Sequence, residues 1–175
     1  MAYQVRFESN AFEADSMIGK ALDALTSLSR KVQKISGAQI RAEEVDRLKT
    51  LRGVCHRTFE RAMDWADKDF DQEMTDVKWD WPRKTYRKNG QIIDAGKRDI
   101  VDTGALLNSK KRETISANIT EFIWDDTSRG FDVATAIHDG GRTKNGGDIP
   151  ARPWTDHALD EIDTIVAAII NEERK

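Results

Sequence analysis

The residue types that most often carry chemistry are few in this chain. The three histidines, His56, His138 and His157, stand neither four residues apart on a helix nor near Cys55 at the spacing of metal ligands. No stretch has the pattern of a phosphate-binding glycine loop, a nucleophile elbow or a pair of catalytic acids. We therefore expect no metal site, no cofactor and no enzymatic activity.

Two pairs of neighbouring residues are the best candidates if the chain is an enzyme after all. His138 and Asp139 could act as a base beside a carboxylate. Asp125 and Asp126 could bind a metal ion in a turn. Because adjacent acids in a turn are mostly solvated, the enzymatic interpretation is the weaker one.

Length and composition predict one soluble domain over residues 1–175. The chain has 175 residues, of which 38% are hydrophobic and 34% charged, and no apolar run approaches the roughly 20 residues of a membrane span. The N-terminus shows no secretory signal, and the lone Cys55 cannot form an intrachain disulfide. Synthesis in a reducing cytoplasm is the expectation.

Charge is distributed unevenly along the chain. Residues 1–82 carry a formal net charge of -2, residues 83–112 one of +6 and residues 113–175 one of -7. This asymmetry indicates contacts with oppositely charged neighbours or with other copies of the chain. An alternative is a nucleic-acid-binding module that uses the basic segment 83–112 with Tyr86, although the sequence pI of about 5.7 disfavours it.

Hydrophobic periodicity predicts the elements of the first half. Alternating residues predict a strand over Tyr3–Glu8, and helical spacing predicts a first helix from about Asn10 to Ser36. A long apolar stripe predicts a second helix from about Ala42 through Phe70, in which Gly53 favours a kink or a break.

The helical pattern stops at Trp79–Pro82, and the following residues have no clear period. We expect a long exposed basic loop at about 82–100, with a small hairpin turning at Asn89 and Gly90 as the alternative. Its basic residues are predicted to bind a partner protein: Arg83, Lys84, Arg87, Lys88 and Arg98.

The central segment Asp102–Ser109, DTGALLNS, is predicted to be a capped turn. Asp102 or Thr103 can cap a short helix, and Gly104 allows a tight turn. After it the period changes to two, which predicts a hairpin at about 114–138 with strands near 115–123 and 131–137 joined by a turn at 125–130. Gly140 and Gly141 follow the hairpin and permit a turn at the sheet edge.

A final helix is predicted to begin at Thr155 or Asp156, after Pro150 and Pro153. The expected fold class is α+β, with N-terminal helices and a C-terminal helix packed on a small antiparallel sheet that contains the hairpin.

The order of these features resembles the tail-completion or neck proteins of tailed double-stranded-DNA bacteriophages. That family has a D-T-G-x-L-x-x-S turn before its sheet and an A-R-P-F sequence before its last helix, where this chain has Trp154 in place of Phe. The resemblance covers about the second half of the chain. The matching residues are Asp102, Thr103, Gly104, Leu106, Ser109, Ala151, Arg152, Pro153 and Trp154.

The resemblance implies a non-catalytic virion component that forms a ring with identical subunits and joins the phage head to the tail. Implied partners are other neck and tail proteins, namely a connector or adaptor, a tail terminator or a tail tube, with packaged DNA nearby and no membrane. Arg152 is expected to hydrogen-bond carbonyls or a carboxylate, and Trp154 to pack under the hairpin. Both residues could equally serve only to stabilise the fold.

Overall fold

The structure is a computed structural model, and it describes most of the chain. For residues 38–45 only the backbone is described. The segment predicted as a first helix, from about Asn10 to Ser36, lies outside the described residues. The described ranges are 2–8, 38–86, 90–101, 104–116, 119–126, 132–142 and 147–173.

The chain divides into two compact units. The single-domain expectation stays a prediction. The first unit comprises Met1–Arg6, Asp64–Glu113 and Glu121–Asp163, and the second comprises Phe7–Met63, Thr114–Thr120 and Thr164–Lys175.

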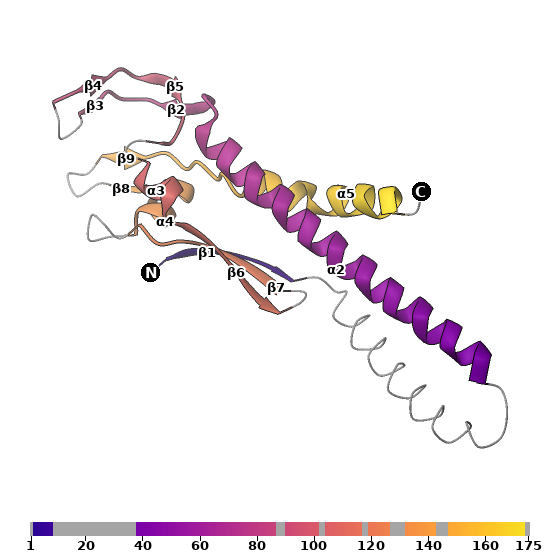
Figure 1. The fold of residues 1–175 in the computed structure, drawn as a ribbon. Coiled ribbons are helices and arrows are strands. Elements are labelled where there is room, and N and C mark those ends of the chain that lie inside the picture. Colours follow the sequence, from indigo (N-terminus) through magenta and orange to yellow (C-terminus); the bar gives the residue numbers. More distant parts are fainter. Residues whose placement is uncertain are drawn as a thin grey trace. The chain divides into compact units, whose positions relative to one another are not determined.

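The elements confirm the predicted α+β class (Figure 1). The helices are α2 (Ala38–Thr75), α3 (Ala105–Asn108), α4 (Val133–His138) and α5 (Asp156–Glu173). The strands are β1 (Tyr3–Glu8), β2 (Trp79–Trp81), β3 (Thr85–Tyr86), β4 (Ile92–Ile93), β5 (Gly96–Arg98), β6 (Lys110–Ser116), β7 (Ile119–Trp124), β8 (Gly141–Arg142) and β9 (Asp148–Ile149).

Helix α2 is the long helix that the apolar stripe predicts, and it begins four residues earlier than expected. It runs through Gly53 without a break. In the first unit, Ala66, Phe70 and Met74 are buried at steps of four residues. No helix in the described ranges is long and apolar enough to span a membrane.

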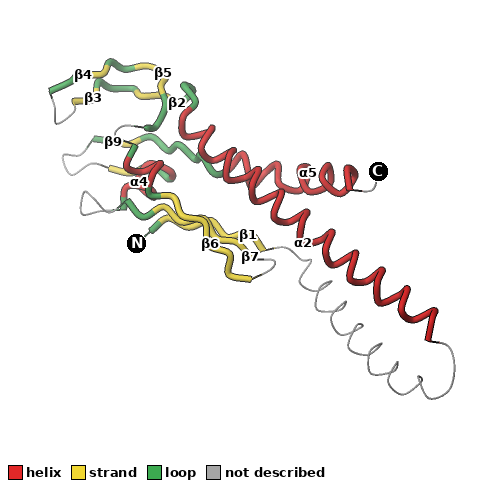
Figure 2. The backbone as a smooth tube through the Cα atoms, viewed as in Figure 1, coloured by secondary structure: helices red, strands yellow, loops and turns green. Residues whose placement is uncertain are grey.

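The segment after α2 is the hairpin that the sequence left as an alternative to a loop (Figure 2). Strand β2 pairs antiparallel with β5, and β3 pairs antiparallel with β4. Gly90, one of the two expected turn residues, has a φ of 82°. The two ladders share nearly the same register, so residues 79–98 form one arm, which we call the basic hairpin.

Strands β1, β7 and β6 form a three-stranded sheet in that order. The predicted strand at Tyr3–Glu8 is confirmed as β1. The hairpin in this sheet is made by β6 and β7, which are joined by residues 117 and 118, and it therefore lies earlier than the expected 114–138.

The predicted second strand, near 131–137, is wrong because Val133–His138 form helix α4. Asp132 occupies the N-cap, where its side chain accepts a hydrogen bond from the backbone N–H of Thr135. The residues buried by α4 are Val133, Ala134 and His138, a helical spacing. A short apolar run of this length fits a strand and a helix equally well, and the cap decides for the helix.

Helix α5 begins at Asp156, as predicted. Between α4 and α5, the glycine-rich segment contains the short antiparallel pair β8 and β9. Gly140, just before this pair, has a φ of 76°, and a Cβ built there would lie 2.8 Å from both the Ile149 carbonyl oxygen and the Ala151 nitrogen. Gly141, in contrast, faces open space and has no positive φ, so the expected turn depends on Gly140 alone.

Gly140→Ala is expected to lower the free energy of unfolding by about 2 kcal/mol or more, because it combines left-handed backbone strain with a backbone clash. Gly90→Ala is the matched control, since its φ is also positive but no atom lies within 4 Å of the added Cβ. It should cost about 1 kcal/mol. Urea denaturation of both variants measures the difference, and equal losses would contradict the proposed clash.

Candidate functional site

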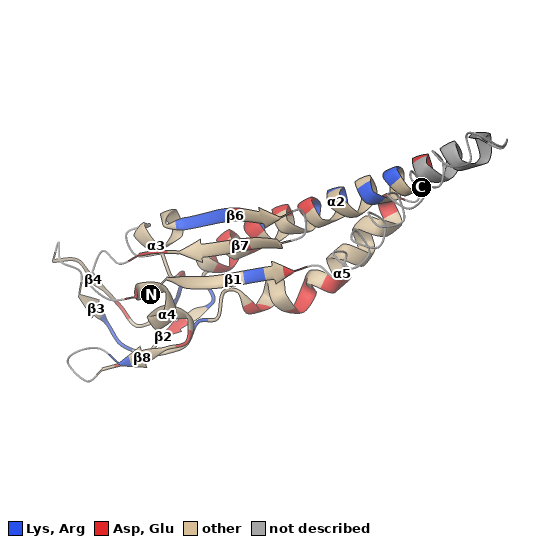
Figure 3. Ribbon diagram, turned by 90° about the horizontal axis from the view of Figure 1, so that it is seen from below, with Lys and Arg blue, Asp and Glu red and all other residues tan. Residues whose placement is uncertain are grey.

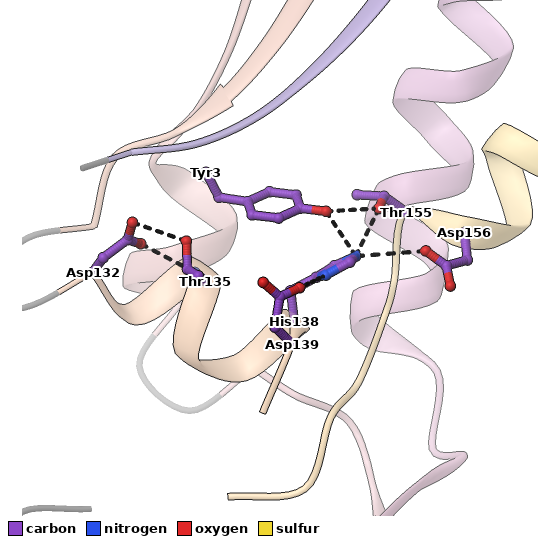
Figure 4. Close-up of polar contacts among 7 residues, drawn as sticks. All are labelled: Tyr3, Asp132, Thr135, His138, Asp139, Thr155 and Asp156. Carbon is purple, nitrogen blue, oxygen red and sulfur yellow. Dashed lines mark hydrogen bonds and ion pairs between the residues drawn. The ribbon is translucent and has the colours of Figure 1, made fainter. Parts of the chain in front are cut away.

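A buried histidine forms the centre of a polar network in the first unit (Figure 4). The His138 Nδ1 atom lies 2.6 Å from Asp139 Oδ1. On the other side of the ring, His138 Nε2 lies 2.9 Å from the Tyr3 hydroxyl and 2.7 Å from Thr155 Oγ1. We call Tyr3, His138, Asp139, Thr155 and Asp156 the histidine network.

Three separate elements supply these side chains. Tyr3 is the first residue of β1, His138 is the last residue of α4, and Thr155 directly precedes α5. Asp156 opens α5, with its Oδ1 3.7 Å from His138 Nε2. The network therefore links the start of β1 to the end of one helix and the start of another.

The arrangement of Asp139, His138 and Thr155 resembles the acid, base and hydroxyl of a nucleophilic site. The Thr155 hydroxyl, however, belongs to a fully buried residue, at 0% exposure. A neutral imidazole that donates its Nδ1–H to Asp139 presents Nε2 as an acceptor for a hydroxyl proton, so the network can satisfy its own hydrogen bonds. In this geometry the Thr155 hydroxyl is closed to solvent and is hydrogen-bonded within the network.

The sequence paired His138 with Asp139 correctly, because the two are neighbours in the chain. It missed Tyr3 and Thr155, which lie 135 and 17 residues away from His138. Of the other candidate pair, Asp125 is exposed and Asp126 is buried. Within the part of the chain that the structure describes, no group of three or more His, Cys, Asp or Glu residues is placed to hold a metal ion.

Burial raises the pKa of the Tyr3 phenol above its ordinary value of 10.0. The hydrogen bond with Thr155 lowers this pKa in part, while the charges of Asp139 and Asp156 raise it further. The phenol is therefore protonated at neutral pH and can donate a hydrogen bond to His138 or to Thr155.

An aromatic cluster packs against the network. The Trp154 ring lies 4.9 Å from the His138 ring and 5.6 Å from the Tyr3 ring, centroid to centroid. It also meets Trp124 of β7 edge-on at 5.9 Å, and Trp124 in turn meets Phe70 of α2 at 5.3 Å. Trp154 thus packs against the β6–β7 hairpin, as its expected role as an anchor requires.

Arg152 is buried to 1% exposure two residues before Trp154. Its Nη1 donates to the Pro150 carbonyl and its Nη2 to the Asp80 carbonyl of β2, both at 3.2 Å. The sequence left open whether Arg152 donates to carbonyls or to a carboxylate. In the structure both of these acceptors are backbone carbonyls. Burial lowers the pKa of Arg152 to about 10, and the charge of Arg98 lowers it as well.

The Trp81 ring of β2 contacts two guanidinium groups, those of Arg98 and Arg152. The Arg152 Cζ is 3.8 Å and the Arg98 Cζ is 3.5 Å from the Trp81 ring centroid. Arg98 also donates from Nη2 to the Thr85 hydroxyl at 2.6 Å. We call Trp81, Arg98 and Arg152 the arginine–tryptophan stack, which ties the base of the basic hairpin to the segment that precedes α5.

The described part of the DTGALLNS motif, residues 104–109, contains a single short turn of helix, α3. Gly104 occupies the N-cap of α3 with a φ of 77°. Asp102 and Thr103, the residues expected to cap this helix, lie outside the described ranges. Leu106 is buried, and the Ser109 hydroxyl donates to the Leu106 carbonyl at 2.8 Å. Gly104, Leu106 and Ser109 of the motif therefore stabilise the conformation of this turn.

The predicted partner-binding residues have different surroundings. Arg83 is exposed, Lys84 forms an exposed ion pair with Asp94 at 2.9 Å, and Arg98 belongs to the stack. Arg87 and Lys88 lie outside the described residues.

Strand β6, shown in Figure 3 with its basic residues in blue, has its charge largely compensated within the first unit. Lys110 Nζ lies 2.6 Å from Asp67 Oδ1 and 2.5 Å from Asp71 Oδ1 of α2. Arg112 pairs with Asp64 of the same helix.

Tyr3→Phe is expected to reduce the slope with which the free energy of unfolding falls as the pH rises into the alkaline range. Because the folded-state pKa of Tyr3 exceeds 10.0, its contribution is present below about pH 10 and is lost as pH rises above that value. Urea titrations at several values from pH 8 to above 10 measure the slope. Tyr86→Phe is the control, since Tyr86 is the exposed second tyrosine. Equal slopes in wild type and Tyr3→Phe would contradict the assignment.

Arg152→Ala is expected to lower the free energy of unfolding by about 2–4 kcal/mol, because it removes buried packing and leaves the Asp80 and Pro150 carbonyls without their donor. Arg152→Lys should recover only part of this loss, since a lysine cannot stack on Trp81 as a planar group. Arg142→Ala, at an exposed ion pair with Asp148, serves as control and should change stability by less than about 0.5 kcal/mol. A full rescue by lysine would refute the role of the stack.

No family model, no curated protein and no solved structure matches this chain. The resemblance to phage neck proteins therefore depends on the two sequence motifs and their order.

Proposed function

We propose that this chain is a non-catalytic structural component of a tailed-phage virion, which forms a ring of identical subunits and completes the neck so that head and tail join. The observation that carries the proposal is the position of the ARPW motif. Arg152 and Trp154 are both buried where the basic hairpin, α4 and the start of α5 come together in the first unit. The motif that defines the resemblance is thus also a determinant of this fold.

The geometry of the histidine network supports a structural role over a catalytic one. The Thr155 hydroxyl and the His138 imidazole are buried, and they are hydrogen-bonded to each other. A catalytic triad, in contrast, needs a hydroxyl that a substrate can reach.

The charge pairs argue against the alternative that the basic segment 83–112 binds nucleic acid. Lys110 and Arg112 already face carboxylates of α2, and Arg98 stacks on Trp81. Phosphate binding would have to compete with these partners. The positive charge that remains for contacts with other molecules belongs mainly to the basic hairpin. A protein partner fits this hairpin better than a nucleic acid does.

The expected partners are identical subunits and neighbouring neck or tail proteins, such as a connector or adaptor, a tail terminator or a tail tube. Packaged DNA would lie nearby, and no membrane is involved. The protein would be made in the host cytoplasm and end up in the virion.

A phage that carries a stop codon early in this gene is expected to produce filled heads and finished tails that remain separate, because the joint between them is missing. Negative-stain microscopy of the lysate measures the fraction of joined particles. A synonymous change at the same codon is the control and should leave joining intact.

Expression of variants from a plasmid separates the two interpretations of the network. Wild type and Asp139→Asn should both restore joining, because an exposed carboxylate contributes one hydrogen bond to a structural network but is essential to a catalytic one. Normal infectious virions from the stop-codon phage would refute the proposed function, and loss of joining with a well-folded Asp139→Asn would reopen the catalytic interpretation.

A further inference from the structure

The first half of α2 carries an apolar stripe that is only partly covered. Leu48 and Cys55 are half-buried, and Leu51 between them is 50% exposed. The stripe continues into Phe59, which is buried. These four residues recur at steps of three and four, so they share one side of the helix, and we call them the α2 stripe. Apolar stripes of this kind pack against another element, and the part from Leu48 to Cys55 therefore needs a cover.

The segment that joins β1 to α2 is long enough to cover this stripe. Strand β1 ends at Glu8 and α2 begins at Ala38, so 29 residues lie between them. The end of β1 and the first half of α2 both belong to the second unit. A helix of residues 18–35 would be about 27 Å long, whereas the α2 stripe spans about 17 Å. The segment thus has the length and the end points that a cover of the stripe requires.

The sequence of this segment contains a second apolar stripe. The helix expected from about Asn10 to Ser36 has its large apolar residues three or four positions apart, so that they fall on one side of it. A helix with one apolar side is stable in water only when that side is covered. The residues of this stripe are Ile18, Leu22, Leu25, Leu28, Val32 and Ile35.

Only a short loop separates the expected helix from α2. The expected helix ends near Ser36, and α2 begins at Ala38. Gly37 between them is the residue type that most commonly follows the end of a helix. Two consecutive helices joined by so few residues lie antiparallel beside each other. The expected helix should therefore run back along the first half of α2.

The two stripes match when both are counted away from this loop. Because residues rise by the same amount in both helices, facing residues must lie at similar distances from Gly37. Leu28 and Leu48 are nine and eleven residues from Gly37, and Ile18 and Phe59 are 19 and 22 residues from it. Each member of the α2 stripe thereby meets an apolar residue: Leu48 meets Leu28, Leu51 meets Leu25, Cys55 meets Leu22, and Phe59 meets Ile18.

We propose that residues 18–35 form a helix that packs antiparallel on the first half of α2 in the same chain, with Leu22 facing Cys55 and Leu25 facing Leu51. Burial of both apolar stripes stabilises this helical hairpin. Its remaining sides are polar, so other molecules contact it there and not through the α2 stripe. The proposal concerns the second unit and does not rest on the proposed function.

Disulfide formation with the native Cys55 tests the register on the purified full-length chain. Cys55 is free and is the only cysteine in the sequence, so one added cysteine allows one intrachain disulfide. Leu22→Cys places a thiol opposite Cys55, and oxidation with copper phenanthroline should join the two sulfurs. Non-reducing peptide mapping by mass spectrometry measures the rate and the yield.

Lys20→Cys is the matched control, because residues two positions apart do not share a side of a helix. Lys20 and Leu22 are almost equally far from Cys55 along the chain, so a segment without a fixed helical side would oxidise at the same rate in both variants. We expect Leu22→Cys to form the intrachain disulfide about tenfold faster or more, because only its thiol meets the distance that a disulfide requires.

A second pair tests the same register one helical turn away. Leu25→Cys/Leu51→Cys, made in a Cys55→Ser background, should also form an intrachain disulfide. This pair keeps the test decisive if Leu22→Cys alone fails to fold. Circular dichroism melts of all variants confirm that each one is folded before its oxidation is compared.

Equal rates for Leu22→Cys and Lys20→Cys would overturn the proposal, as would the absence of an intrachain disulfide in both designed pairs. Disulfides formed by Leu22→Cys between two chains instead of within one would also overturn it, and would assign the α2 stripe to the segment of a second copy. None of these outcomes bears on the stop-codon experiment, so the helical hairpin and the proposed function can fail separately.

Discussion

Burial of Arg152, Trp154 and Thr155, in the short segment between β9 and α5, is the constraint on which the rest of the first unit depends. The backbone of this segment is held by the Arg152 N–H, which donates to the Ile137 and His138 carbonyls at the end of α4. Arg152 then reaches the base of the basic hairpin, Trp154 enters the aromatic cluster, and Thr155 joins the histidine network. Neighbouring side chains of one short segment thereby position elements from distant parts of the chain.

This burial has a cost that the surrounding contacts must offset. Arg152 is a buried cation that, among the described residues, has carbonyls and an indole ring as partners and no carboxylate. The indole N–H groups of Trp124 and Trp154 are also buried, and neither meets an acceptor in the part of the chain described. The packing of large aromatic rings from α2, β7 and β1 supplies the compensation, because each ring removes a large apolar area from water. The segment is consequently stable only when the whole cluster is assembled.

Charges in the first unit fall into two groups with different consequences. On β6 and α2 they are paired with each other, as Lys110 and Arg112 are with their aspartates, and this pairing fixes the strand against the helix. On the exposed sides of the basic hairpin and of α5, charges such as those of Arg83, Lys97, Asp160 and Asp163 remain open to solvent. Unpaired charge contributes little to folding but steers association, so the distribution separates the surfaces that hold the fold from those suited to partners.

The sequence by itself determined the elements whose signal is local. Alternation of apolar and polar residues predicted β1, and apolar residues three to four positions apart predicted α2 and α5. The adjacent positions of His138 and Asp139 predicted their pairing. Each of these patterns depends only on residues that are close together in the sequence. The sequence-based prediction of a strand near 131–137 was wrong, because a short apolar run fits the period of a strand and that of a helix. Only the tertiary structure brought Tyr3 and Thr155 to His138, and Asp80 to Arg152. Those contacts join residues up to 135 positions apart, and they depend on burial around a shared aromatic core, which no local period encodes.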